Sequence, residues 1–221
     1  MARSAGNQIA VIGLGRFGSS MAVELERRGC EVLAIDHHPR RTQQFADELT
    51  HVATVDSTDD EALRQLGVDE VQRAVVAIGT DLEASVLTTS VLADFAVPHI
   101  WAKATSRQQA RILERVGAEH VVLPEHDMGE RLAHLVTGRM LDYIQVEQDF
   151  AMAKTRSPAE AVGRRLDEAR LRTKYGITIV GIKRPGEDFT YATADTVLQD
   201  GDTVIVSGKP AQIERFADVA R

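Results

Sequence analysis

A short apolar segment followed by a turn and an amphipathic helix recurs between residues 8 and 124, and this repeat constrains the fold more than any other feature. The apolar segments cover residues 9–12, 32–35, 52–55, 74–78, 99–102 and 121–123. They are almost continuously apolar, as are strands covered on both faces. The helical segments cover residues 21–28, 41–49, 59–66, 82–95 and 107–116. This alternation predicts an α/β fold, a Rossmann-like doubly wound parallel sheet.

The pattern changes after Pro124. Residues 127–143 predict one long helix, and residues 145–153 alternate between apolar and polar. Residues 163–172 predict a helix, and residues 177–182 and 203–206 predict strands that are separated by turn-rich segments. We therefore expect a small, mostly antiparallel α+β module in the second part. The predicted domains are residues 1–143 and residues 144–221.

Composition narrows the classes of function. Hydrophobic residues make up 43% of the 221 residues and charged residues 27%, as in an ordinary globular protein. The longest apolar runs have about six residues, against roughly 20 needed to cross a bilayer, so we expect no membrane span. The net charge of −7 argues against a nucleic-acid partner, which requires a basic surface. The single cysteine, Cys30, cannot form an intramolecular disulfide, so a cytoplasmic location is expected.

A glycine-rich loop follows the first predicted strand and opens the first helix. Its residues are Gly13, Leu14, Gly15, Arg16, Phe17 and Gly18. Glycines permit a tight turn and close approach of the backbone to a phosphate, which the helix N-terminus attracts. Asp36 ends the second strand, 18 residues after Gly18, where an acid accepts hydrogen bonds from ribose hydroxyls. The alternative is a simple glycine-rich turn in which Asp36 caps a helix or turn.

Two further positions in this region each have two interpretations. Asp56 and Ser57 follow the third strand and are expected to face a bound base, but Ser57 and its neighbours are also good helix N-caps. Arg16 is suited to counting phosphate charge, since a guanidinium pairs well with a terminal phosphate. Its alternative is a solvated residue at the helix start.

The second part of the chain lacks groups that an oxidoreductase would need. Hydride transfer requires a group that moves a proton, yet residues 142–221 contain no histidine. The histidines before them lack the spacing of zinc ligands. These observations favour a sensor and no enzyme, with an NAD-dependent small-molecule oxidoreductase as the alternative. A redox-sensing DNA-binding repressor fits poorly, because no basic recognition helix is present.

The glycine loop and Asp36 combine with further segments into a family pattern. These are Val55-Asp56-Ser57-Thr58, Ala77-Ile78-Gly79-Thr80-Asp81, Ala102-Lys103-Ala104, Leu171-Arg172, Tyr175-Gly176 and Leu198-Gln199-Asp200-Gly201-Asp202. The pattern resembles the N-terminal and C-terminal RCK modules of TrkA and KtrA proteins. Those proteins are cytoplasmic regulatory subunits of bacterial potassium transporters and channels. The resemblance covers residues 8–217.

The resemblance implies a site, a ligand and an assembly. It implies an adenine nucleotide, ATP or ADP or else NAD or NADH, bound by Gly13, Leu14, Gly15, Arg16, Phe17, Gly18, Asp36, His37, Asp56, Ser57, Ile78, Gly79 and Lys103. It implies that Glu125 lies near a divalent or monovalent cation between subunits. It also implies homodimers that build a tetramer or an octameric ring beneath a membrane-embedded Trk-type or Ktr-type potassium channel subunit. The chain would then be peripheral on the inner face of the membrane.

The pattern departs from the family at one position. C-terminal modules that bind cyclic di-AMP carry a proline-containing apolar patch in the stretch that matches Phe189-Thr190-Tyr191-Ala192. Here no proline lies between Pro185 and Pro210. Binding of cyclic di-AMP is therefore not expected, although Arg170, Arg172 and Tyr175 leave it open.

Overall fold

The computed structural model describes residues 8–220, which form two compact units. The first unit ends at His126 and the second begins at Asp127. Within the described residues, no helix has both the length and the apolar character that crossing a membrane requires.

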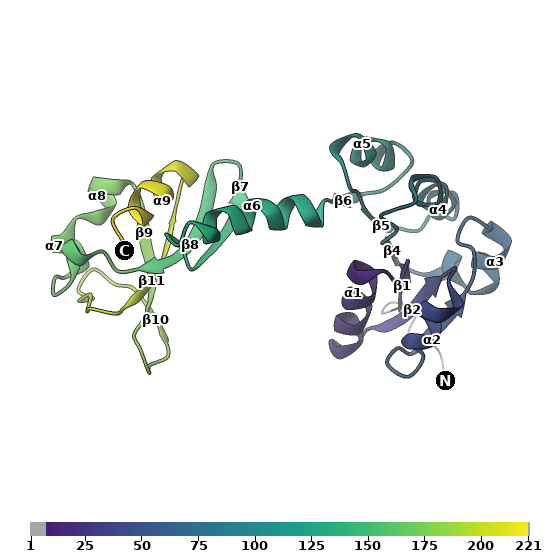
Figure 1. The fold of residues 1–221 in the computed structure, drawn as a ribbon, viewed down its shortest axis with the longest axis horizontal. Coiled ribbons are helices and arrows are strands. Elements are labelled where there is room, and N and C mark those ends of the chain that lie inside the picture. The colour runs from purple at the N-terminus through teal and green to yellow at the C-terminus, as the bar shows by residue number, and fades with distance from the viewer. Residues whose placement is uncertain (1–7, 221) are drawn as a thin grey trace. The chain divides into compact units, whose positions relative to one another are not determined.

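A six-stranded parallel sheet forms the centre of the first unit (Figure 1). The strand order is β3-β2-β1-β4-β5-β6, with the crossover next to β1. The strands are β1 (Gln8–Ile12), β2 (Glu31–Asp36), β3 (His51–Thr54), β4 (Arg73–Val76), β5 (His99–Lys103) and β6 (His120–Val122). This order confirms the predicted doubly wound sheet, and it places the carboxyl ends of β1 and β4 at the point where ligands bind in such folds.

Helices cover both faces of this sheet. They are α1 (Arg16–Arg27), α2 (Pro39–Gln44), α3 (Asp60–Gln65), a short η1 (Val68–Glu70), α4 (Leu82–Asp94) and α5 (Arg107–Arg115). Val11 of β1 packs in a core with Ala22 of α1, whereas Ile12 packs in a second core with Leu92 of α4 and Leu113 of α5. Neighbouring residues of one strand are thus buried on opposite faces, which explains the continuous apolar runs.

The helix expected over residues 41–49 is shorter than predicted and starts earlier. Pro39 takes the first turn of α2, a position that its fixed φ angle favours. After Gln44 the chain turns more tightly, because the N–H groups of Phe45, Ala46 and Glu48 each bond to a carbonyl three residues earlier. Leu49 then returns to the core beside β2.

The prediction of one long helix over residues 127–143 was wrong at both ends. The helix α6 spans Pro124–Val136, and residues 142–147 form the strand β7 (Asp142–Glu147). Gly138 ends the helical region, since it has a φ of 71° and its N–H bonds to the carbonyl of Leu135 at 2.9 Å. A left-handed glycine at this place is a common helix C-cap.

An antiparallel five-stranded sheet forms the second unit, with the order β10-β9-β11-β8-β7. The remaining elements are β8 (Phe150–Arg156), η2 (Ala159–Ala161), α7 (Leu166–Ala169), α8 (Leu171–Tyr175), β9 (Thr178–Lys183), β10 (Phe189–Tyr191), β11 (Thr203–Gly208) and α9 (Pro210–Ala217). Ile213 and Phe216 of α9 pack with Ala153 and Val206 of the sheet. The expected antiparallel α+β module is present, with β10 and α9 as elements that the sequence did not predict.

The predicted helix over residues 163–172 is two short helices, because Arg170 between them has a φ of 50°. The division of the chain into compact units falls between residues 126 and 127, within α6. The domain boundary expected at residues 143 and 144 lies beyond α6 and stays a prediction.

Candidate functional site

The glycine loop joins β1 directly to α1. Gly13 has a φ of 99°, and its N–H donates to the carbonyl of Ile35 at 2.7 Å. A Cβ atom on Gly18 would overlap the carbonyl oxygen of Gly13 and lie 2.9 Å from the Cβ of Ala77. Gly13 and Gly18 are therefore required by the fold itself, because they let α1 pack against the end of β1.

Gly15 has a different role. A Cβ on Gly15 would meet nothing within 4 Å, so this face of the loop is open. Gly15 is the N-cap of α1 and provides no side-chain cap, and no acidic residue lies in the first turn. Arg16 follows it and is exposed. A helix N-terminus of this kind presents backbone N–H groups and a partial positive charge to an anion.

Asp36 ends β2, and its carboxylate contacts this loop. Its Oδ2 accepts the N–H of Leu14 at 2.7 Å and Nη1 of Arg41 at 3.2 Å, and its Oδ1 accepts the N–H of His38 at 2.8 Å. Burial alone would raise the pKa of Asp36, but the His38 and Leu14 N–H groups and the Arg41 guanidinium together lower it below its ordinary value. Asp36 is therefore a buried carboxylate that stays ionised at neutral pH.

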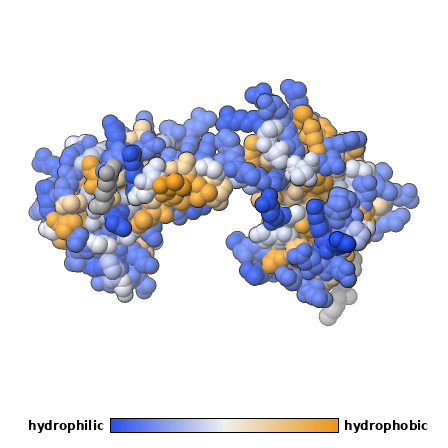
Figure 2. All heavy atoms as spheres, in the orientation of Figure 1, coloured by the Kyte–Doolittle hydropathy of each residue, from blue (hydrophilic) through white to orange (hydrophobic). Residues whose placement is uncertain are grey.

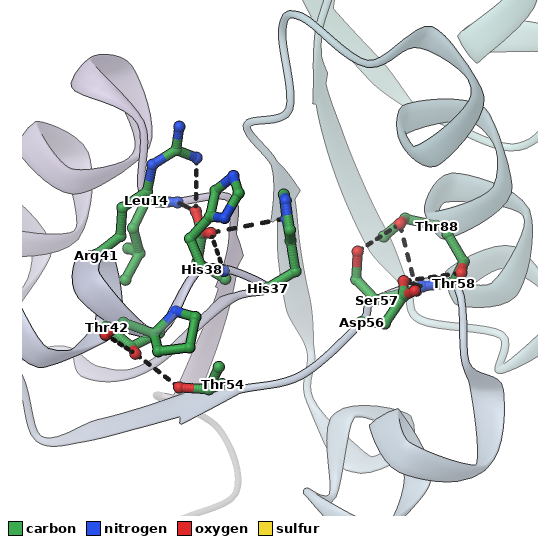
Figure 3. A network of polar contacts seen from close by, with 12 residues as sticks. Leu14, His37, His38, Arg41, Thr42, Thr54, Asp56, Ser57, Thr58 and Thr88 are labelled. Atoms are coloured by element: carbon green, nitrogen blue, oxygen red, sulfur yellow. Dashed lines mark hydrogen bonds and ion pairs between the residues drawn. The ribbon is translucent and has the colours of Figure 1, made fainter.

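His37 lies between the two acids that the sequence singled out (Figure 3). Its Nδ1 is 3.7 Å from Oδ1 of Asp36. Hydrogen bonds from the N–H and hydroxyl of Thr58 lower the pKa of Asp56, and His37 adds a smaller favourable interaction. Asp56 is exposed and uses Oδ1 for the contacts with Thr58, at 2.9 and 2.8 Å.

The contacts of Ser57 exclude it as the helix cap, and its expected position facing a base stays a prediction. Asp59, not Ser57, is the N-cap of α3, with its side chain accepting the N–H of Ala62 at 3.0 Å. The Ser57 hydroxyl is buried and lies 2.7 Å from the hydroxyl of Thr88 in α4 (Figure 3). Ser57 therefore ties the segment after β3 to α4 rather than capping a helix.

Lys103 is the last residue of β5. It is 9% exposed, and its Nζ donates to Oε1 of Glu125 at 2.7 Å. The same Nζ lies 5.6 Å from the centre of the Phe17 ring and 3.2 Å from the place that a Cβ on Gly79 would take. Gly79 thus leaves room for the lysine, and the pair joins the end of β5 to the start of α6.

Glu125 is the exposed member of this pair. The hydrogen bond from Lys103 is the main cause that lowers its pKa, and the charge of Arg16 contributes. Within residues 8–220, no group of three or more His, Cys, Asp or Glu residues is arranged to hold a metal ion.

Ile78, another expected site residue, lies beside the glycine loop. Its side chain is 3.2 Å from the place that a Cβ on Gly13 would take.

The structure places most of the expected residues at the carboxyl ends of the parallel strands, and it adds two that the sequence did not single out. These are Arg41, which contacts Asp36, and Thr88, which contacts Ser57. The basic run His37-His38-Pro39-Arg40-Arg41 directly after an acid was an available signal for Arg41. Thr88 had none, since its role depends on how α4 packs.

The fold and the glycine loop define a class: a Rossmann-like module with open space at Gly15, followed by a small antiparallel module. Family models agree, with a TrkA-N domain over residues 9–124 and a TrkA-C domain over residues 152–221. The chain belongs to the TrkA/KtrA family, as its sequence resemblance predicted.

Curated relatives support this membership, and a solved structure shares the fold. The chain is 37% identical to Ktr system potassium uptake protein C of Bacillus subtilis over 95% of both chains. It is 33% identical to Ktr system potassium uptake protein A of the same organism over 98% of both. The crystal structure of the GsuK RCK domain has the same fold, with a TM-score of 0.65 at 16% identity over 100% of this chain and 49% of that one. These relatives favour a regulatory protein over the oxidoreductase alternative.

Proposed function

We propose that this chain is the nucleotide-sensing regulatory subunit of a potassium uptake system. In this role its partner is a membrane-embedded Ktr-type or Trk-type subunit, which it controls. Through that partner it is held at the inner face of the membrane. The observation that carries the proposal is the open N-terminus of α1 at Gly15, with Arg16 beside it. The ionised carboxylate of Asp36 contacts the same loop through the N–H of Leu14. The potassium uptake relatives, which match over nearly the whole chain, supply the biological setting.

The proposed ligand is an adenine nucleotide. Phosphates fit at the open face of Gly15, where the α1 N-terminus and the absence of an acidic first turn favour negative charge. Asp36 is the acceptor for the ribose hydroxyls. Asp56, Ser57 and His37 border the place of the base, and Ile78 and Gly79 form the opposite wall. The protein would respond to the phosphate charge of the bound nucleotide.

Arg16 is proposed to discriminate ATP from ADP. Its side chain is exposed, and its charge acts on Glu125 across the crevice. A terminal phosphate would give the guanidinium a charge-assisted partner that ADP lacks. Glu125 is the proposed contact for a cation between subunits, because it is 66% exposed and stays ionised. Such a cation would share the carboxylate with Lys103.

Gating then follows from a shift in population between two shapes of a ring. A ligand moves such an equilibrium only by its different affinity for the two states. Moving a gate from mostly closed to mostly open takes roughly 5 kcal/mol. Divided over eight sites, this is less than about 1 kcal/mol each, within reach of one charge-assisted hydrogen bond per site. A homodimer that builds a tetramer or an octameric ring is therefore the proposed form.

The test combines binding with transport. The purified chain is titrated with ATP, ADP and NADH by calorimetry, and its native mass is measured with each nucleotide. Potassium uptake is then measured in vesicles that hold the membrane subunit, with and without the chain. Adenine nucleotide binding together with nucleotide-dependent uptake supports the proposal. Steady consumption of NADH with a small-molecule substrate would overturn it.

A further inference from the structure

The carboxylate proposed to bind ribose is closed to solvent in this structure. The Asp36 side chain is only 1% exposed, although a ribose hydroxyl must reach one of its oxygens. Three close partners enclose it, namely Leu14, His38 and Arg41 (Figure 3). A carboxylate has about four acceptor positions, so these hydrogen bonds leave little room for further donors.

The partners differ in how easily they can leave. The contacts with Leu14 and His38 come from backbone N–H groups, so breaking them would reshape the glycine loop or the turn after β2. The contact with Arg41 comes from a long side chain that is 46% exposed, at 3.2 Å. A side chain of this length has many alternative rotamers, and its exposed end can return to solvent when it leaves the carboxylate.

We propose that Arg41 is an internal competitor of the nucleotide ribose. Its guanidinium holds the acceptor position on Asp36 that a ribose hydroxyl needs, and it leaves that position when the hydroxyl binds. The inference rests on the proposed function and deepens it, since it names a residue that sets nucleotide affinity without being a ligand contact. Arg41 thus tunes the concentration of nucleotide at which the crevice fills.

A neighbouring arginine provides a matched control. Arg40 lies one residue earlier in the same turn of α2 and is exposed, and the hydrogen bonds and ion pairs of Asp36 within residues 8–220 do not include it. Arg40→Gln and Arg41→Gln remove the same charge from the same helix. Only Arg41→Gln removes the hydrogen bond to Asp36.

The experiment compares two ligands that differ only in the ribose. Calorimetry measures the Kd of ADP and of 2′,3′-dideoxy-ADP for the full chain and for the variants R41Q and R40Q. We expect R41Q to bind ADP roughly two- to fivefold more tightly, because the guanidinium no longer competes for Asp36, and to bind dideoxy-ADP unchanged. R40Q should leave the ratio of the two Kd values unchanged. A merely structural role would move both ligands together.

Each contrary result has its own meaning. Weaker ADP binding by R41Q would make Arg41 a ligand contact, and equal changes for both ligands would make its effect one of general charge. An unchanged ADP Kd would show that no competition exists. Each of these overturns the inference while nucleotide binding stands. Failure of the unmodified chain to bind either ligand would overturn the proposed function and this inference with it.

Discussion

Asp36 Oδ2 accepts the backbone N–H of Leu14 at 2.7 Å, and this contact spans 22 positions of the sequence. It fixes the glycine loop of β1 and α1 to the end of β2. The carboxylate therefore supports the shape of the crevice in addition to its proposed contact with ribose. Substitutions at Asp36 report on both roles, and these can be separated by measuring binding and stability together.

The first prediction concerns nucleotide affinity. Asp36→Ala should weaken binding of every nucleotide with free ribose hydroxyls by roughly 1–3 kcal/mol, since one or two hydrogen bonds to a charged acceptor are lost. Calorimetry with ADP measures the change. Asp47→Ala, which removes an exposed acid from the segment after α2, is the control. Unchanged ADP affinity in the Asp36 variant would remove the ribose contact from the crevice.

The second prediction concerns acid stability. The pKa of Asp36 is lower in the folded chain than the ordinary value of 3.8, which describes the unfolded chain. Its contribution to the free energy of unfolding is therefore complete above about pH 4 and is lost as the pH falls through the folded pKa. The difference in stability between the unmodified chain and Asp36→Asn should shrink below pH 4. Urea unfolding between pH 3 and pH 7 checks this, and a constant difference would contradict it.

The third prediction separates two glycines of one loop. Gly18→Ala should lower the free energy of unfolding by about 1–3 kcal/mol, because the added methyl group overlaps the carbonyl of Gly13. Gly15→Ala has open space around the same atom, so it should leave stability nearly unchanged while weakening nucleotide binding. Thermal unfolding and calorimetry on both variants make the comparison. Normal ADP binding by Gly15→Ala would place the phosphates elsewhere.

The fold of the first unit was predictable because each strand is buried on both faces. Ala10 and Val11 are neighbours in β1, yet both are fully buried, and only a doubly covered strand produces such runs. The second unit was less predictable. Phe189, Thr190 and Tyr191 of β10 are all exposed, so no periodic pattern marks this edge strand. The C-terminal end of α6 was also predicted wrongly. Apolar residues continue after Gly138, but the chain there enters the strand β7 and not a longer helix.

The candidate site was predictable only where backbone geometry fixes it. Gly13 directly follows β1, Gly18 lies in the first turn of α1 and Asp36 ends β2, and these are the places that the sequence predicted. The contacts of Arg41 and Thr88 depend on side-chain rotamers and on how two helices pack against the sheet. Only Arg41 had a local signal, the basic run that directly follows Asp36. The contact of Thr88 with Ser57 joins positions 31 apart in the sequence, so no local pattern could predict it.

The fourth prediction concerns assembly. Met128, Leu132 and Val136 form one apolar stripe along α6 at a spacing of four residues, and Val136 is 84% exposed. Further apolar atoms gather over the part of the second unit that holds β7 and β8 (Figure 2), where Ile144 and Val146 are exposed. Exposed patches of this kind mark interaction surfaces. We expect a dimer or larger assembly that uses α6.

Leu132→Glu should weaken that assembly, whereas Ala133→Glu, which lies about 100° around the same helix from Leu132, should not. Light scattering at micromolar concentration measures the mass of each. A stable monomer of the unmodified chain would contradict the prediction, and equal effects of the two variants would exclude the apolar stripe as the contact.

The last prediction tests whether Arg16 reads the terminal phosphate. ATP and ADP share the ribose, the base and the inner phosphates, so only the third phosphate offers the guanidinium a different partner. Arg16→Ala should therefore lower ATP affinity more than ADP affinity. A charge-assisted contact contributes roughly 1.5–3 kcal/mol, so the preference for ATP over ADP should change by about tenfold or more. Arg27→Ala, at the far end of α1, removes the same charge as a control.

Transport gives the functional readout of the same variant. Potassium uptake through the membrane subunit should lose its dependence on ATP in Arg16→Ala, while the chain still folds and still binds ADP. Retained folding is expected because Arg16 is exposed and lies at the first position of α1, where few contacts depend on it. Equal losses of ATP and ADP affinity would remove Arg16 from phosphate discrimination. Exclusive binding of NADH by the unmodified chain would instead point to a redox signal, because a dinucleotide offers Arg16 no terminal phosphate to count.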